Sequence, residues 1–128
     1  MPPENFKEWI KEADNDIGFG ELNLDHEDYS SRVCFFFQQG VEKYLKAFIV
    51  YHKLDFKKTH NLLTLLEICR QKDNNIEEIK ESCIFLNPFY IDTRYPVHWP
   101  SNYDKTKVLK AFEEARKVRN YIKNVLNS

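Results

Sequence analysis

The sequence predicts an all-α fold, an antiparallel up-and-down bundle of four long helices and a shorter fifth, and three observations support this. Apolar residues recur at helical spacing in five separate stretches. Polar turn residues separate these stretches, and none of them alternates in the manner of a half-buried strand. The 128 residues suffice for one core. We therefore expect residues 1–128 to form a single domain.

The stretch around Gly40 is the expected central helix. One broad apolar sector should face the core, with Gly40 where a side chain would hold a neighbouring helix away. The members of this sector are Val33, Phe36, Phe37, Gly40, Val41, Tyr44, Ala47, Phe48 and Tyr51. A narrower set, Phe35, Leu45 and Ile49, lies roughly opposite. A helix this apolar must be covered on two sides, so we expect the second set to contact another helix or a second subunit.

Capping residues and helix breakers define the ends of the predicted helices. The expected starts are Asn5, Asp25 with Asp28, Thr59 or His60, Asn75 with Glu78, and Ser101 with Asp104. The first helix is expected to end at about Phe19, where Gly18 and Gly20 break it, and the fourth to end near Pro88. The other expected ends are about His52, Gln71 and Leu126. Segment 91–103 lacks helical periodicity, and its two tyrosines and one tryptophan indicate an ordered loop.

Composition narrows the classes of partner. The net charge of −1 gives no global electrostatic case for binding nucleic acid or an anionic membrane. No apolar run approaches the length of a membrane span, and the N-terminus lacks the pattern of a signal peptide, so we expect a cytoplasmic protein. The cysteines Cys34, Cys69 and Cys83 occupy apolar helix positions and are interpreted as small core residues.

Segment 91–103 contains one pair of side chains suited to phosphate chemistry. Arg94 could bind a phosphate through its guanidinium group while His98 transfers a proton near neutral pH. Residue types alone favour a structural alternative, in which Arg94 anchors the loop and His98 lies on the surface.

The central helix and the following helix start offer further candidates. A narrow polar arc could line an anion pocket with Arg94, or could be a solvated face. Its members are Arg32, Gln39, Lys43 and Lys46. Backbone N–H groups near His60 favour an anion, although Thr59 as a plain cap is the simpler interpretation. No metal-ligand spacing, phosphate loop or nucleophile elbow occurs in the sequence, so we expect neither a metal nor a cofactor.

Three motifs together resemble the HEPN domain. They are Cys34-Phe-x-x-Gln38-Gln39-x-Val-Glu42-Lys43-x-Leu-Lys46-Ala47, Thr59-His60-x-Leu62-x-x-Leu65 and Tyr90-x-x-Thr93-Arg94-Tyr95-Pro96, in this order along the chain. The resemblance implies a helical bundle, commonly a homodimer, that is often paired with a minimal nucleotidyltransferase in a toxin–antitoxin or related two-component system. It also implies binding of a nucleotide or RNA phosphate. Our first hypothesis is that Arg94 holds the phosphate, while Lys43 and Lys46 add positive potential and Gln39 helps to form the site. In this hypothesis Tyr95 or Trp99 stacks on a base, and His60 or His98 supplies a hydrogen bond.

One branch of the family consists of metal-independent ribonucleases, in which an arginine and a histidine act on the RNA phosphate and the ribose 2′-hydroxyl. Arg94 matches that arginine, but His98 follows it at a shorter interval than in the family motif, and Tyr95 replaces a small polar residue. An endoribonuclease toxin that uses Arg94 and His98 is therefore the alternative to a binding protein. A non-catalytic structural partner is the second alternative.

Overall fold

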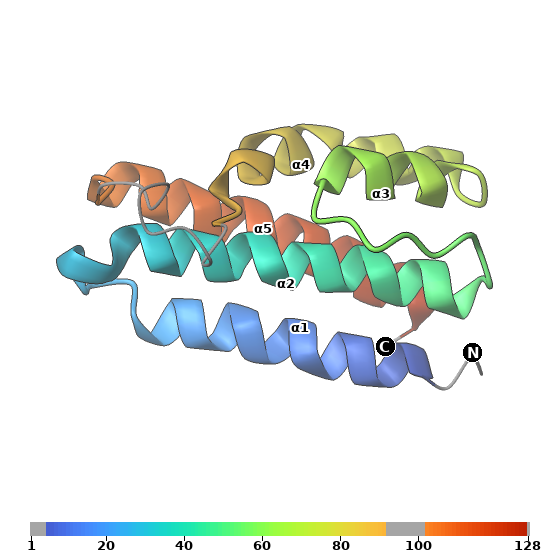
Figure 1. Ribbon diagram of the computed structural model, residues 1–128, viewed down its shortest axis with the longest axis horizontal. Helices are drawn as coiled ribbons and strands as arrows, with labels where there is room; N and C mark the ends of the chain where they lie inside the picture. The colour runs from blue at the N-terminus through green and yellow to red at the C-terminus, as the bar shows by residue number, and fades with distance from the viewer. Residues whose placement is uncertain (1–4, 92–101, 128) are drawn as a thin grey trace.

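The computed structural model describes residues 5–91 and 102–127, and within these ranges it contains helices and no strand (Figure 1). The α-helices are α1 (Asn5–Leu22), α2 (Ser30–Tyr51), α3 (Leu62–Arg70), α4 (Lys80–Leu86) and α5 (Lys105–Leu126), with 3₁₀ turns at Glu27–Tyr29, Asn74–Ile79 and Asn87–Phe89. The all-α prediction is confirmed. In the described part of the chain, however, three helices are long and two are short, because 3₁₀ turns form both ends of the expected long helix after residue 75 and leave only α4 between them.

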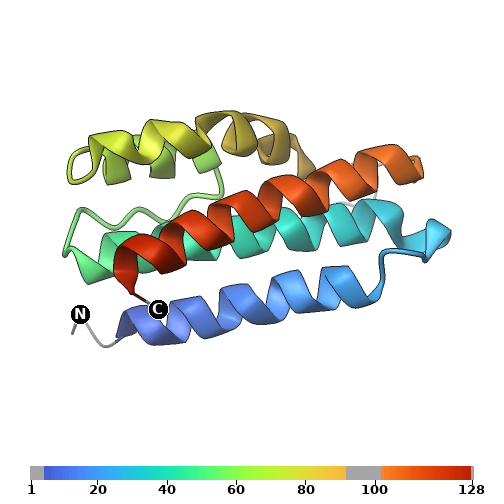
Figure 2. The same cartoon turned by 180° about the vertical axis from the view of Figure 1, so that it is seen from behind.

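The helices form three layers. Helices α2 and α5 lie side by side in the middle, α1 covers one side of them, and α3 with α4 covers the other (Figures 1 and 2). The link between α2 and α3 runs back along α2, so that α3 runs in the same direction as α2. This path departs from a strictly up-and-down order, and it places the start of α3 beside the middle of α2.

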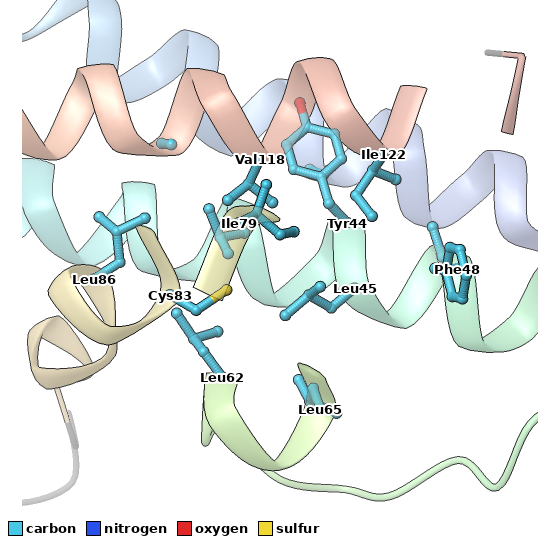
Figure 3. Packing of buried hydrophobic residues seen from close by; sticks show 14 of the residues in the cluster. Tyr44, Leu45, Phe48, Leu62, Leu65, Ile79, Cys83, Leu86, Val118 and Ile122 are labelled. Carbon is cyan, nitrogen blue, oxygen red and sulfur yellow. The ribbon is translucent and has the colours of Figure 1, made fainter. Parts of the chain in front are cut away.

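Helix α2 is covered on both sides, as its two apolar sets require. Most of the broad sector is buried, while Phe36 is partly exposed and Tyr51 lies at the surface. Leu45 and Ile49 of the opposite set are fully buried within the chain. Figure 3 shows Leu45 among side chains of α3 and α4, including Leu62, Leu65 and Cys83. Burial of Leu45 and Ile49 is therefore confirmed, whereas Phe35 is only partly buried.

Glycine permits close packing of α1 on α2. A Cβ atom at Gly40 would lie 2.5 Å from Cδ1 of Ile17 and 3.3 Å from the backbone oxygen of Ala13. A Cβ atom at Gly20 would lie 2.5 Å from the ring of Phe37. The predicted role of Gly40 is confirmed. The predicted end of α1 is wrong, because Gly20 packs as a buried helical residue and the helix continues to Leu22.

Several predicted helix starts are also wrong. Helix α2 begins at Ser30 with no side-chain cap, and Asp25 instead pairs with Lys105 of α5. The side chain of Asn61, rather than Thr59 or His60, caps α3. Asp73, rather than the predicted Asn75, caps the 3₁₀ turn Asn74–Ile79 and accepts a hydrogen bond from the Asn75 N–H group.

The last helix begins later than predicted, at Lys105, because Asp104 rather than Ser101 stands at its N-cap. Asp104 accepts a hydrogen bond from the backbone N–H of Lys107 at 2.8 Å. Ser101, its expected companion, lies outside the described residues, as does most of the expected loop 91–103. Helix α5 ends at Leu126, where Asn127 takes up a left-handed conformation.

Candidate functional site

A buried carboxylate on α2 gathers polar side chains from two segments. Oε2 of Glu42 accepts a hydrogen bond from the Lys46 ammonium group at 2.8 Å. Oε1 lies 2.9 Å from Nδ1 of His60 and 3.0 Å from Nε2 of Gln39. The Gln38 side chain donates to the backbone oxygen of His60 at 2.9 Å and accepts from Gln39 at 2.8 Å. We call these five residues the Glu42 network.

Burial makes the ion pair of this network energetically important. The side chains of Lys46 and Glu42 are only 8% and 4% exposed. The pair has the i,i+4 spacing of a surface pair, but it is not on a solvated face. The interpretation of the polar arc as a solvated face is therefore wrong for Lys46. A charge buried to this degree must be paired, because leaving it unpaired costs several kcal/mol.

Two aromatic rings lie within cation–π distance of the Lys46 ammonium group. Its Nζ lies 5.7 Å from the ring centroids of Trp9 on α1 and Phe56 in the link. The two rings also contact each other, with centroids 5.6 Å apart. Lys46 therefore ties α1, α2 and the link together, and its charge is directed at Glu42.

His60 is the most exposed member of the network, with half of its side chain accessible to solvent. Its ring stacks on Tyr90 with centroids 4.2 Å apart and an interplanar angle of 15°. Tyr90 immediately precedes the last described residue before the gap at 92–101. The stack therefore joins His60 to a residue that precedes Arg94 by four positions in the sequence.

The N-terminus of α3 is already occupied by side chains. The Asn61 side chain accepts hydrogen bonds from the N–H groups of Leu63 and Thr64 at 2.9 and 3.2 Å. The Asn87 side chain accepts from the N–H group of Leu62 at 2.8 Å. The first N–H groups of a helix are the ones that attract an anion. Because protein oxygens take these three, the helix start does not offer the anion site considered from the sequence.

Lys43 lies apart from the Glu42 network. Its ammonium group lies 2.6 Å from the carboxylate of Asp16 on α1. Burial raises the pKa of Asp16, and the hydrogen bond and charge of Lys43 oppose that rise. Close by on α1, Asp14 binds the Tyr44 hydroxyl and pairs with Lys123 of α5 at 2.9 Å. The structure thus assigns the two lysines of the predicted site to different neighbours.

The structure brings together three of the predicted site residues, namely Gln39, Lys46 and His60. Arg94, Tyr95 and His98 lie outside the described residues. Sequence reasoning missed Gln38 and Glu42 as the centre of the site. Both residues belong to the motif that carries the family resemblance. Their polar side chains lie between apolar neighbours that are buried, and this pattern could have indicated a buried polar network. The stacking of Tyr90 on His60 had no such signal.

Three further properties of the described residues bear on their function. Within 5–91 and 102–127, no group of three or more His, Cys, Asp or Glu side chains is arranged to hold a metal ion. In the same ranges, no helix has the length and hydropathy to cross a membrane. The three cysteines are free and buried, and burial raises the pKa values of Cys34 and Cys83 to about 12. This confirms their interpretation as core residues.

These features define a class of helical-bundle proteins in which a buried polar network on the central helix supports a half-exposed histidine. The model of the HEPN domain family matches residues 6–125 of the chain. This match covers almost the whole sequence, so the protein belongs to the HEPN family. No curated protein matches the sequence significantly.

Two solved structures share the fold. TT1696 from Thermus thermophilus is similar with a TM-score of 0.80 and 23% sequence identity, over 94% of this chain and 97% of that one. ST0689, an archaeal HEPN homologue, is similar with a TM-score of 0.72 and 21% identity, over 93% and 95% of the two chains. Both likenesses span nearly whole chains, which supports the all-helical fold at full length.

Proposed function

We propose that this HEPN protein binds a nucleotide or an RNA phosphate at the exposed edge of the Glu42 network. One observation carries the proposal: a buried carboxylate holds the half-exposed His60 ring in place. A polar network is costly to bury, and it fixes the orientation of a side chain that solvent can reach. Such an arrangement is expected where a ligand must be recognised. Membership of the HEPN family supports a nucleotide as that ligand.

The roles we propose follow from the charges in the described part of the chain. Lys46 is neutralised by Glu42 and Lys43 is paired with Asp16, so neither has an unopposed charge for a phosphate. We therefore assign the phosphate contact to Arg94, four residues after Tyr90, because a guanidinium group binds phosphate in a bidentate manner. In this proposal Tyr95 offers a face for base stacking.

Lys46 and Gln39 act indirectly in this proposal, since both bind Glu42 and so hold the His60 ring. Lys43 would add only weak positive potential, because Asp16 lies against it. The proposed assembly is a homodimer in the cytoplasm that works with a minimal nucleotidyltransferase in a toxin–antitoxin-like system. Family membership is the support for this assembly, which co-expression with a candidate nucleotidyltransferase and co-purification would test.

Thermal denaturation with nucleotides tests the binding function. A ligand present at 100 times its dissociation constant should stabilise the protein by about 2.7 kcal/mol. For a chain of this size, that free energy raises the melting temperature by roughly 10 °C. We expect such a shift for the wild-type protein with a nucleotide triphosphate, and a much smaller shift for the Arg94→Ala variant.

Lys43→Ala is the matched control, because it removes a cation from the same helix at a place away from the Glu42 network. Its ligand-induced shift should stay close to that of the wild type, because Asp16 already offsets most of the Lys43 charge. A wild-type protein that shows no shift with any nucleotide or short RNA contradicts the proposal. Incubation of the same preparations with structured RNA in EDTA tests the ribonuclease alternative, since cleavage that is lost in an Arg94→Ala, His98→Ala double variant would establish it.

A further inference from the structure

The Nε2 atom of His60 is the open end of the Glu42 network. Within the described part of the chain, no side chain or carbonyl group forms a hydrogen bond to this atom, and half of the side chain is exposed. Tyr90 covers one face of the ring in a nearly parallel stack. A ligand therefore reaches the ring most readily at the edge that carries Nε2.

The hydrogen bonds of Glu42 determine which proton His60 carries. Oε2 accepts from the Lys46 ammonium group at 2.8 Å and Oε1 from the Gln39 amide at 3.0 Å, so both carboxylate oxygens act as acceptors in this arrangement. Nδ1 of His60, 2.9 Å from the same carboxylate, must then donate its proton to it. In a neutral imidazole with a proton on Nδ1, Nε2 is a hydrogen-bond acceptor.

An acceptor at this position calls for a donor on the ligand. The described groups that could have bound a phosphate nearby are already used, because Lys46 pairs with Glu42 and the N-terminus of α3 is capped by Asn61 and Asn87. The donors of a nucleotide are its ribose hydroxyls and its base N–H groups. A base edge combines donors with acceptors and needs a matched set of protein groups, whereas a single acceptor suffices for a hydroxyl.

We infer that Nε2 of His60 accepts a hydrogen bond from a ribose hydroxyl, so that the site takes ribonucleotides in preference to deoxynucleotides. This inference rests on the proposed function and adds the class of sugar to it. A net hydrogen bond at a partly exposed position corresponds to an affinity ratio of roughly 3 to 10. That ratio, rather than the absolute affinity, is the quantity to measure.

Calorimetric titration of the full chain with ATP, GTP, CTP and UTP, each beside its 2′-deoxy and 3′-deoxy forms, provides the test. We expect at least one ribonucleotide to bind more tightly than one of its deoxy forms by roughly 3- to 10-fold. The His60→Asn variant should reduce this ratio to about one, whatever its absolute affinity for the deoxy form. Its amide nitrogen can still donate to Glu42 in place of Nδ1, while no atom remains at the position of Nε2. His60→Gln, whose amide oxygen can lie near that position, should restore part of the ratio.

The pH dependence of the same ratio separates an acceptor from a donor. In the part of the chain that the structure describes, the charged and titratable groups that contact the His60 ring or its carboxylate partner are Glu42, Lys46 and the phenol of Tyr90. A neutral imidazole is required for the acceptor role, so the preference for ribonucleotides should disappear as the imidazole becomes protonated in acid. A preference that grows in acid would assign the donor role to Nε2 and overturn the inference.

This design distinguishes failure of the ribose preference from failure of nucleotide binding. Equal affinities of ribonucleotides and both deoxy forms for the wild type overturn the inference while the proposed nucleotide binding stands. Failure of every nucleotide to bind the wild type removes the proposed function as well. A ratio that persists in His60→Asn also overturns the inference, because it would place the hydroxyl contact elsewhere.

Discussion

Replacement of Glu42 by methionine should destabilise the protein strongly, because it leaves the Lys46 charge without its partner. The Lys46 side chain is 8% exposed, so little solvent can replace the carboxylate. Breaking a buried pair from one side costs about 3–5 kcal/mol. Lys46→Met should cost less, about 2 kcal/mol, since Gln39 and His60 still bind the remaining carboxylate. The asymmetry between the two single variants is itself part of the prediction.

The double variant, with methionine at both positions, completes the thermodynamic cycle. Replacement of both charges by apolar side chains of similar volume removes the burial cost along with the attraction, so its destabilisation should be smaller than the sum of the single losses by about 2 kcal/mol or more. Urea denaturation followed by circular dichroism gives the free energies of unfolding. Additive losses, or single variants within about 0.5 kcal/mol of the wild type, would mean that the pair is solvated, and would refute the buried network.

Three further outcomes follow from the packing and are measured with the same protein. Gly40→Ala should lower the free energy of unfolding by about 1–3 kcal/mol, because its Cβ would lie 2.5 Å from a core side chain. Gly18→Ala, whose Cβ would have nothing within 4 Å, should raise the free energy of unfolding by up to about 1 kcal/mol. Urea titrations that show equal effects of the two substitutions would contradict the close approach of α1 to α2. Asn61→Ala should cost about 1 kcal/mol through loss of the α3 cap, and a neutral result would show that water replaces it. Burial raises the pKa values of Cys34 and Cys83 to about 12, and all three cysteines are buried. No thiol should therefore react with a disulfide reagent at pH 8 until urea unfolds the chain. Fast reaction of the native protein would contradict the burial of the cysteines.

Local periodicity was sufficient to predict the helices but not their ends. The apolar sectors of α2 follow from spacing alone, and the burial of Leu45 was expected from its place opposite the main sector. The cap of α3 could not be chosen in this way, because Thr59, His60 and Asn61 are all polar. A contact distant in sequence helps fix the start of the helix, since the Asn87 side chain binds the N–H of Leu62.

The candidate site was predicted in part, for a geometrical reason. Gln39, Lys43 and Lys46 share a narrow arc of α2, and residues three apart on a helix differ by about 60° in direction. That difference is enough for Lys43 to meet Asp16 on α1 while Lys46 turns to Glu42 and the ring of Phe56. The neighbouring elements therefore decide which lysine joins the site. The positions of the two lysines on α2 do not by themselves predict the partner of either one.

The path of the link between α2 and α3 explains how His60 reaches this site at all. Helix α2 ends at Tyr51, where Lys53 adopts a left-handed conformation and the N–H of Leu54 bonds to the Ile49 oxygen. Tyr51 lies nine positions after Glu42 in α2, which corresponds to about 14 Å along the helix. A short antiparallel connection at the end of α2 would therefore have left His60 about that far from Glu42.

The link has enough residues to return. Residues 52–61 can span about 33 Å when extended, more than twice that separation. Two contacts secure the returning chain on α2, because the Phe56 ring lies against Lys46 and the His60 carbonyl accepts from Gln38. The polar network and the unusual direction of α3 therefore depend on each other. Disruption of Gln38 should release the link and the imidazole together, so that loss of ligand binding and loss of stability occur in the same variant.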